Sequence, residues 1–179
     1  MSRIAYVNGR YVHHREAAVH VEDRGYQFAD GVYEVCEVRD GRLVDERRHF
    51  DRLARSLSEL RIRTPMSRAA LGIVLRETVR RNRVRDGIVY LQVTRGVARR
   101  DHAFPPASVS PSLVITARAL DVAGRESTAE QGIAVVTVPE NRWPRVDIKS
   151  VSLLPTCWRR RPLARPGPRR RGSSMRKAM

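Results

Sequence analysis

Hydrophobic residues follow a two-residue period in several short stretches of this chain, which predicts β-strands joined by tight turns. Residues 4–12 predict a β-hairpin, because an Asn-Gly pair, a strong turn signal, separates two apolar pairs. Residues 31–44 predict a second hairpin around an Asp-Gly pair. Residues 87–94, 113–117 and 133–138 are β-branched, apolar runs that predict three further strands.

Two stretches show the longer period of amphipathic helices. Within residues 46–60, three leucines lie at i, i+4 and i+7 and so share one helical face. Ser67 is a suitable N-cap for a second helix that runs to about residue 81. Hairpins followed by two helices and then by strands indicate an α+β fold.

The composition fits one ordinary domain, or one domain and a tail. The chain has 179 residues, of which 41% are hydrophobic, enough to build a core. No stretch approaches the roughly 20 apolar residues of a membrane span, and the N-terminus lacks a signal-peptide core. The only two cysteines, Cys36 and Cys157, argue against a disulfide scaffold and favour a reducing cytoplasm.

Positive charge is concentrated near the C-terminus. Residues 157–179 hold nine basic residues and no acid, so the first 156 residues carry only +7 of the formal net charge of +16. This segment is rich in Arg, Pro and Gly and has no apolar period, so we expect it to be disordered. A basic arm that binds nucleic acid is one interpretation. A shifted reading frame in GC-rich DNA is the other.

Lys149 is the only lysine in the first 156 residues, and Lys177 is the only other one among 35 basic residues. Arginine stays protonated at any working pH, whereas a lysine can lose its proton and act as a nucleophile or base. A Schiff base with a carbonyl compound, including pyridoxal phosphate, is the leading chemistry for such an amine. Codon bias explains a rare lysine equally well, and composition alone does not decide between the two.

Specific motifs near Lys149 and upstream of it occur in a defined order. They are EDRGYQFADGVYEV at 22–35, HFDRL at 49–53, QVTRG at 92–96 with RDH at 100–102, and DIKS at 147–150. In kind and order they resemble the motifs of the class IV (fold-type IV) pyridoxal-phosphate aminotransferases, and most of all the D-amino-acid (D-alanine) transaminases. The resemblance covers residues 1–156. It implies a small N-terminal α+β domain with an antiparallel sheet and two helices.

The resemblance implies a cofactor site built from three residues. Lys149 matches the lysine that forms a Schiff base with pyridoxal 5'-phosphate and moves a proton between the substrate Cα and the cofactor C4′. Arg52 matches the arginine that binds the cofactor phosphate, for which the guanidinium fork is well suited. His49 lies one helical turn before Arg52 and is expected to support this site.

The resemblance also implies substrate-binding residues. Tyr33 matches an active-site tyrosine whose hydroxyl helps to hold the lysine and the substrate, and Arg100 and His102 match the pair that captures the α-carboxylate of D-amino acids. Taken alone, a tyrosine in a strand is usually core and an Arg-Asp-His run is usually a polar loop. Arg24 and Asp30 are interpreted as residues that fix a turn and a loop. The remaining histidines have no spacing typical of a metal site.

The activity implied is transamination of D-amino acids, of the type D-alanine and 2-oxoglutarate giving pyruvate and D-glutamate. Branched-chain transaminases, aminodeoxychorismate lyases and (R)-selective amine transaminases share the scaffold and are the alternatives. A basic nucleic-acid-binding fragment without catalysis is an alternative of another class. The expected partners are a small amino acid, a 2-oxo acid and, for the intact protein, a second copy in a homodimer; neither a membrane nor nucleic acid is expected.

Three parts are expected along the chain. Residues 1–120 form the α+β domain, residues 121–156 join it to the start of a C-terminal domain and carry Lys149, and residues 157–179 form the tail. The family continues after the lysine with Asn-x-x-x-Lys and a second domain that contacts the cofactor ring and phosphate. Because this sequence departs from that pattern after Thr156, we favour the frameshift interpretation. We expect such a chain to bind the cofactor poorly and to be nearly or wholly inactive.

Overall fold

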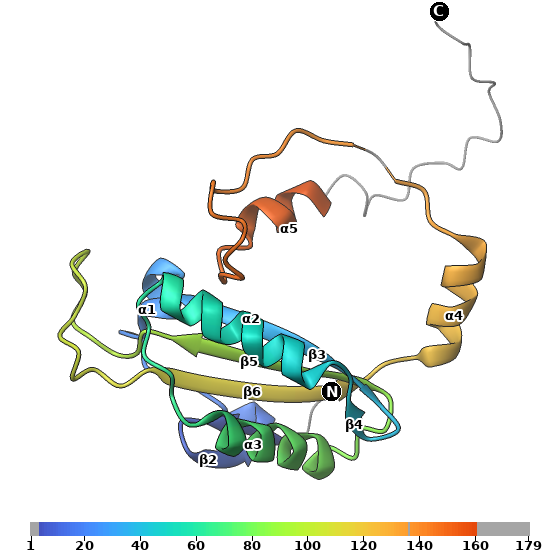
Figure 1. Ribbon diagram of the computed structural model, residues 1–179, viewed down its shortest axis with the longest axis horizontal. Helices are drawn as coiled ribbons and strands as arrows, with labels where there is room; N and C mark the ends of the chain where they lie inside the picture. Colours follow the sequence, from blue (N-terminus) through green and yellow to red (C-terminus); the bar gives the residue numbers. More distant parts are fainter. Residues whose placement is uncertain (1–3, 136, 161–179) are drawn as a thin grey trace, which may run out of the picture.

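One antiparallel sheet forms the centre of the molecule. The computed structural model describes residues 4–135 and 137–160. Six strands occur in the order β2-β1-β6-β5-β3-β4, and all neighbouring pairs are antiparallel (Figure 1). Their bounds are β1 Ile4–Val7, β2 Arg10–His13, β3 Gly31–Arg39, β4 Arg42–Leu43, β5 Gly87–Thr94 and β6 Ser112–Ala119.

Both predicted hairpins are confirmed. Asn8 and Gly9 have φ values of 46° and 95° between β1 and β2, and Asp40 and Gly41 have φ values of 49° and 75° between β3 and β4. A positive φ at both central residues is typical of the turn that matches the twist of two paired strands. Asn, Asp and Gly tolerate this left-handed backbone, which is why these dipeptides predicted the turns.

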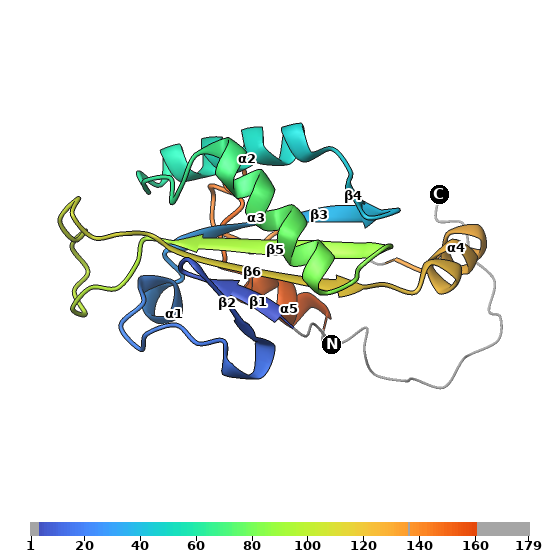
Figure 2. The same cartoon turned by 90° about the horizontal axis from the view of Figure 1, so that it is seen from below.

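Two long helices cover one face of the sheet. They are α2 (Glu46–Glu59) and α3 (Arg68–Arg81), and both pack on the strands (Figure 2). The Ser67 hydroxyl accepts a hydrogen bond from the Ala70 amide at 3.3 Å, so it caps α3 as the sequence predicted. The two predicted helices and the α+β fold are therefore confirmed.

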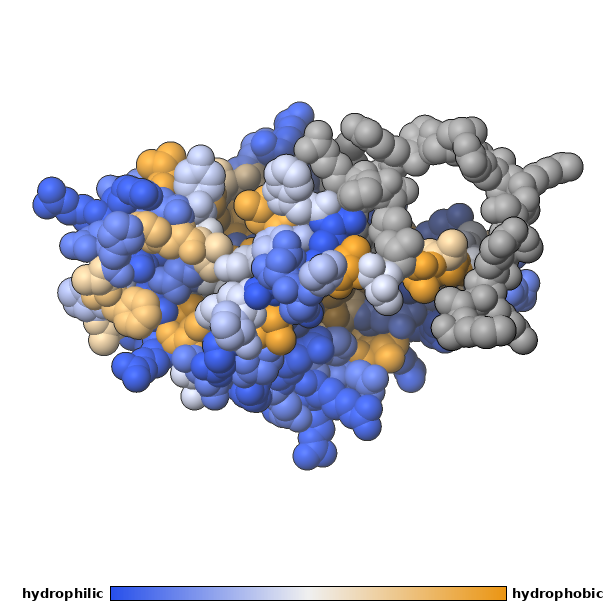
Figure 3. All heavy atoms as spheres, turned by 90° about the horizontal axis from the view of Figure 1, so that it is seen from above, coloured by the Kyte–Doolittle hydropathy of each residue, from blue (hydrophilic) through white to orange (hydrophobic). Residues whose placement is uncertain are grey.

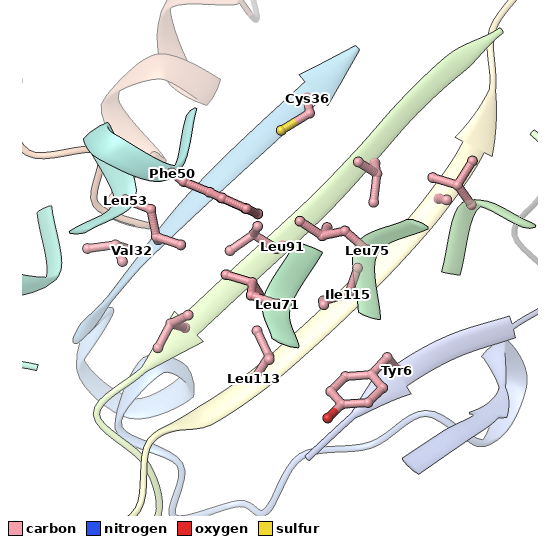
Figure 4. Packing of buried hydrophobic residues seen from close by; sticks show 14 of the residues in the cluster. Tyr6, Val32, Cys36, Phe50, Leu53, Leu71, Leu75, Leu91, Leu113 and Ile115 are labelled. Carbon is pink, nitrogen blue, oxygen red and sulfur yellow. The ribbon is translucent and has the colours of Figure 1, made fainter. Parts of the chain in front are cut away.

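The hydrophobic core lies between this sheet face and the two helices. Val32, Leu91 and Ile115 project from the strands toward Phe50 of α2 and Leu75 of α3 (Figure 4). Each such side chain stabilises the fold by about 1.5–3 kcal/mol when it is fully buried. The same alternation turns the intervening strand residues toward the opposite face of the sheet.

That opposite face is only partly covered. Tyr33, Tyr90 and Thr116 lie on it and are half-buried. After α4 (Val122–Gln131) the chain returns to this side, and α5 (Leu154–Arg160) lies across the sheet from α3 in both views (Figures 1 and 2). The returning segment carries Lys149.

Several short helical segments were not predicted. They are a 3-10 turn at His14–Glu16, α1 (Arg24–Phe28), α4 and α5. The carboxylates of Asp23 and Asp121 accept hydrogen bonds from backbone amides at the starts of α1 and α4, so N-cap signals were present in the sequence. Within residues 4–135 and 137–160, no helix has the length and apolar character that crossing a bilayer requires.

Two predictions are wrong. The run 133–138 forms no strand at its described positions, and Ile133 and Val135 are exposed, because a β-branched run needs a neighbouring strand and this one has none among the described residues. Residues 157–160, predicted as the start of a disordered tail, lie in α5. A proline in the first turn favours that helix. Residues 161–179 lie outside the described residues.

Candidate active site

Three of the residues singled out in the sequence line one cavity. It has a volume of about 270 Å³, and its lining includes Tyr33 of β3, Arg52 of α2 and Lys149 of the returning segment. The rest of the lining comes from that segment, between residues 142 and 153. The fold therefore brings a phenol, a guanidinium and an amine from three distant motifs to one space.

The backbone around Lys149 adds a short pairing to the edge of β3. The Tyr33 amide donates to the Lys149 carbonyl at 3.0 Å, and the Val151 amide donates to the Gly31 carbonyl at 3.1 Å. Ile148 and Ser150 are buried and Lys149 is half-buried, and all three line the cavity. The Lys149 amide also donates to the Ser56 hydroxyl of α2 at 3.3 Å.

Tyr33 provides the surface against which the amine lies. The Lys149 Nζ atom is 4.2 Å from the centroid of the Tyr33 ring, within the range of a cation–π contact. The Tyr33 ring also stacks on Tyr90 at a centroid distance of 5.7 Å. Burial raises the pKa of Tyr90 to about 12, so that phenol stays neutral at any working pH. No described carboxylate forms an ion pair with Lys149.

Arg52 is held by a buried carboxylate. Its Nε donates to Glu34 Oε1 at 2.6 Å and its Nη2 donates to Glu34 Oε2 at 2.8 Å, a bidentate pair. His49 Nδ1 lies 2.8 Å from the same Oε2, so all three side chains form one cluster. Hydrogen bonding to Glu34 raises the pKa of Arg52 above its usual value. Nη1 makes no hydrogen bond to any described residue, and the side chain is 47% exposed where it meets the cavity.

Glu34 is a site residue that the sequence analysis missed. Its side chain is 0% exposed, although a lone ionised carboxylate is expensive to bury. The signal was present: Val32, Glu34 and Cys36 occupy the buried phase of β3, where an acid requires a partner. Local periodicity does not identify that partner, which lies on α2.

An ion-pair network ties the lysine segment to α2. Arg55 donates to the Asp147 carboxylate at 2.7 Å and to the Asp147 carbonyl at 2.9 Å. Arg145 donates both to Asp147 of its own segment and to Glu59 of α2. These pairs are substantially exposed, so each contributes little to stability, but together they fix the segment two residues before Lys149.

Arg100 and His102 lie elsewhere. Neither lines the cavity that holds Lys149. Both instead gather around Phe28 of α1: the Arg100 guanidinium carbon is 4.9 Å from the ring centroid, and the His102 ring is 5.6 Å from it. Both side chains are exposed, and among the described residues Arg100 has no carboxylate partner.

The chemistry available in the cavity is that of an anion site beside an amine. Arg52 Nη1, which has no hydrogen-bond partner among the described residues, suits phosphate oxygens, and Lys149 supplies a nucleophilic nitrogen in the same cavity. Over residues 4–135 and 137–160, no group of three or more His, Cys, Asp and Glu side chains is arranged to hold a metal ion.

Comparisons with known proteins identify the family of this chain. Residues 31–168 match the family model described as amino-transferase class IV. D-alanine aminotransferase of Staphylococcus haemolyticus is 40% identical over 149 residues, which are 83% of this chain and 52% of that protein. D-alanine aminotransferase of Bacillus licheniformis is 43% identical over 147 residues, which are 82% and 51% of the two chains. This chain thus spans about half the length of these relatives.

Solved structures share the fold. A branched-chain amino acid aminotransferase of Escherichia coli matches with a TM-score of 0.68 and 22% identity, over 84% of this chain and 50% of that one. A 4-amino-4-deoxychorismate lyase of Pseudomonas aeruginosa matches with a TM-score of 0.58 and 32% identity, over 72% and 44%. The first likeness bears on the fold alone, whereas the second also includes appreciable sequence identity.

Proposed function

The chain belongs to the class IV aminotransferases, and we propose that it takes part in pyridoxal-phosphate-dependent transamination of D-amino acids. The observation that carries this proposal is the single cavity lined by Lys149, Tyr33 and Arg52. The finer assignment, to D-alanine as donor and 2-oxoglutarate as acceptor, is supported by relatives named D-alanine aminotransferase.

The residues present fit pyridoxal phosphate. A guanidinium whose one edge is fixed by Glu34 and whose other edge is free offers directed donors to a phosphate. The amine needed for covalent attachment lines the same cavity. In this proposal Arg52 binds the phosphate, His49 supports it through Glu34, and Lys149 attaches the cofactor. When bound, the cofactor supplies the electron sink that makes the substrate Cα–H acidic.

The chain's own residues then have defined tasks. With the cofactor bound, the substrate amine would displace Lys149 from it, and the freed Lys149 Nζ would be the group that takes the proton from the substrate Cα and holds it for return. Tyr33 keeps this amine in place, because its ring lies against Nζ and is itself held by Tyr90. The pairing of residues 149–151 with β3 keeps the lysine backbone from shifting relative to Tyr33.

Substrate binding involves a second surface. We assign capture of the α-carboxylate to Arg100 and His102, which are exposed beside Phe28. Because they lie outside the cavity of their own chain, a second copy is the arrangement that would bring them to a cavity. Exposed apolar residues on α1, just before it and in the loop that carries the pair, namely Val21, Tyr26 and Phe104, favour such a homodimer.

Other exposed surfaces and the compartment are part of the same proposal. On the side that carries α5, hydrophobic patches interrupt a polar surface (Figure 3), and Leu154 and Trp158 are among the exposed apolar residues.

We assign residues 1–120 to one domain and residues 121–156 to the start of a second, which would cover the partly open sheet face. Two free thiols, Cys36 and Cys157, suit a cytoplasmic compartment.

Two alternatives receive specific support. The 32% identity to an aminodeoxychorismate lyase favours the same cofactor chemistry with a different substrate. Omission of the 2-oxo acid separates the two, because a lyase needs no amino-group acceptor whereas a transaminase does. Nucleic-acid binding is supported only by charge, and salt-sensitive binding that disappears on deletion of residues 157–179 would favour it.

The decisive experiment is a competition between two lysines. The full chain is incubated with limiting pyridoxal phosphate, reduced with borohydride and digested, and the label on Lys149 and Lys177 is compared by mass spectrometry. Lys177 is an internal control, because the chain has only these two lysines. We expect label on Lys149 even if binding is weak. Equal label on both lysines would refute a built site.

A matched pair of aldehydes tests Arg52. Pyridoxal lacks the phosphate, so the wild type should label Lys149 more efficiently with pyridoxal phosphate than with pyridoxal. In Arg52→Met this preference should be lost while labelling by pyridoxal is unchanged. A preserved preference would show that the phosphate is bound elsewhere.

A further inference from the structure

Arg24 is the most enclosed guanidinium among the ion pairs of the described chain, with 4% of its side chain exposed. Its Nε donates to Asp30 Oδ2 at 2.8 Å. Its Nη1 donates to the Asp101 carbonyl at 2.7 Å and to the Ala103 carbonyl at 3.3 Å. These two carbonyls flank His102, so one side chain binds the backbone on both sides of that residue.

The Arg24 guanidinium contacts the same aromatic ring, that of Phe28, as Arg100 and His102. The Arg24 guanidinium carbon is 4.8 Å from the centroid of Phe28, and the Arg100 guanidinium carbon is 4.9 Å from it. The His102 ring is 5.6 Å from the same centroid. Phe28 is therefore a common contact of all three side chains.

Few other contacts hold the loop at this point: apart from the rings on Phe28, the Arg95 guanidinium carbon lies 3.9 Å from the centroid of the Phe104 ring. Between residues 99 and 104, the hydrogen bonds that reach the described loop from other segments are those of Arg24. The remaining one is internal, from the Ala103 amide to the Asp101 carboxylate at 3.1 Å. Exposed loops with few backbone hydrogen bonds sample many conformations unless a buried group fixes them.

We propose that Arg24 is a positioning residue that sets the placement of Arg100 and His102, and so determines how the α-carboxylate of an amino acid is bound. The part of this inference that concerns the carboxylate rests on the proposed function. The part that concerns the loop rests on the contacts of Arg24 alone.

Arginine suits this task and lysine does not. The planar fork donates in two directions, to Asp30 and to the loop carbonyls, while its face lies on Phe28. Asp30 also binds Arg95 in a bidentate pair, with distances of 2.7 and 2.9 Å. The charge of Arg24 is thus compensated in the interior, whereas the exposed Arg100 keeps its charge for an anion.

The loop is tested without any substrate. In the full chain, the His102 ring proton signals are identified by their loss in His102→Gln, and we expect Arg24→Lys to move them toward the values of an unstructured histidine. We also expect the Ala103 amide to exchange with solvent about tenfold faster, because a charge-assisted contact that orders the loop is lost. Unchanged signals and exchange in folded Arg24→Lys would overturn the inference.

Arg95→Lys is the matched control. It breaks the other guanidinium bridge to Asp30 and the contact of Arg95 with the Phe104 ring, and it leaves the donors to Asp101 and Ala103 in place. We expect it to lower stability while the His102 signals keep their positions. Equal displacement in both variants would mean that Arg24 acts only through general stability, and the inference would be wrong.

D-alanine titration of the His102 signals separates the inference from the proposed function. We expect both Arg24→Lys and Arg100→Ala to raise the half-saturating D-alanine concentration by about tenfold or more, with Lys149 labelling unchanged. A normal response in Arg100→Ala would overturn the substrate role of the pair. A normal response in Arg24→Lys, with Arg100→Ala impaired, would overturn the role of Arg24.

Discussion

Replacing Arg52 with methionine removes the partner of a fully buried carboxylate. Glu34 is 0% exposed and would retain His49 as its one remaining side-chain partner. Breaking a buried ion pair by removing one partner costs about 3–5 kcal/mol, because the other charge is left uncompensated. Since His49 still donates to Glu34 and Arg52 is half-exposed, we expect the lower part of that range, about 3 kcal/mol.

Arg55→Met is a control on the same helix. Arg55 is 50% exposed, close to the 47% of Arg52, and it also pairs with a carboxylate. Its partner Asp147 is 38% exposed, however, and is therefore solvated when the arginine is removed. We expect Arg55→Met to cost no more than about 1 kcal/mol. The contrast isolates the burial of the carboxylate from the loss of an arginine.

The double variant Glu34→Gln/Arg52→Met removes the buried charge as well. We expect it to be more stable than Arg52→Met, and its loss to be at least about 1.5 kcal/mol smaller than the sum of the single losses. Free energies of unfolding come from urea denaturation followed by far-UV circular dichroism at neutral pH, with equal slopes as the check on two-state behaviour. Losses that add within about 0.5 kcal/mol would refute the coupling of Glu34 and Arg52.

Three further predictions concern single residues of the described chain. Burial raises the pKa of the Cys36 thiol to about 12, so iodoacetamide should modify exposed Cys157 at mildly alkaline pH and reach Cys36 only on unfolding, as peptide mass spectrometry would show. Burial alone would raise the pKa of Asp30, but hydrogen bonds from two arginines outweigh it and hold the pKa below 3.8. The native state therefore releases this proton more readily than the unfolded chain does. The ionised Asp30 carboxylate thus stabilises the native state above pH 3.8, and this stability is lost as the pH falls below 3.8. We expect Asp30→Asn to flatten this part of the pH dependence of the urea midpoint. Gly96 has a φ of 103°, and an added Cβ would overlap the Ser110 carbonyl, so Gly96→Ala should lower stability by at least about 2 kcal/mol in thermal unfolding; an unchanged melting temperature would show that the backbone relaxes there.

Short-range signals explain which elements could be predicted. The hairpin turns depend on residues that accept a positive φ, and the two long helices depend on a face of leucines, all within one local window. The run 133–138 has the same β-branched character as β6 but forms no strand at its described positions. A strand is completed by hydrogen bonds to a neighbour, and local composition does not say whether a neighbour exists.

The candidate site was likewise predictable only in part. The motif string around Tyr33, together with the motifs at Arg52 and Lys149, is specific enough to indicate the family from residue order alone, and the shared cavity is consistent with that family. Residue order does not reveal that Arg100 and His102 lie around Phe28, outside the cavity of their own chain. It also does not reveal that Arg24, interpreted as a turn residue, binds the backbone beside His102.

The sequence by itself thus determined the two hairpins with their turn geometry, the two long helices and the kind of chemistry, because each depends on residue type and near neighbours. Tertiary structure decided which groups meet: residues 149–151 pair with the start of β3, and Glu34 of β3 meets Arg52 of α2. Such contacts join distant segments, so they depend on how the sheet and helices pack together. A buried carboxylate indicates that a partner is needed, but only the packed fold supplies one.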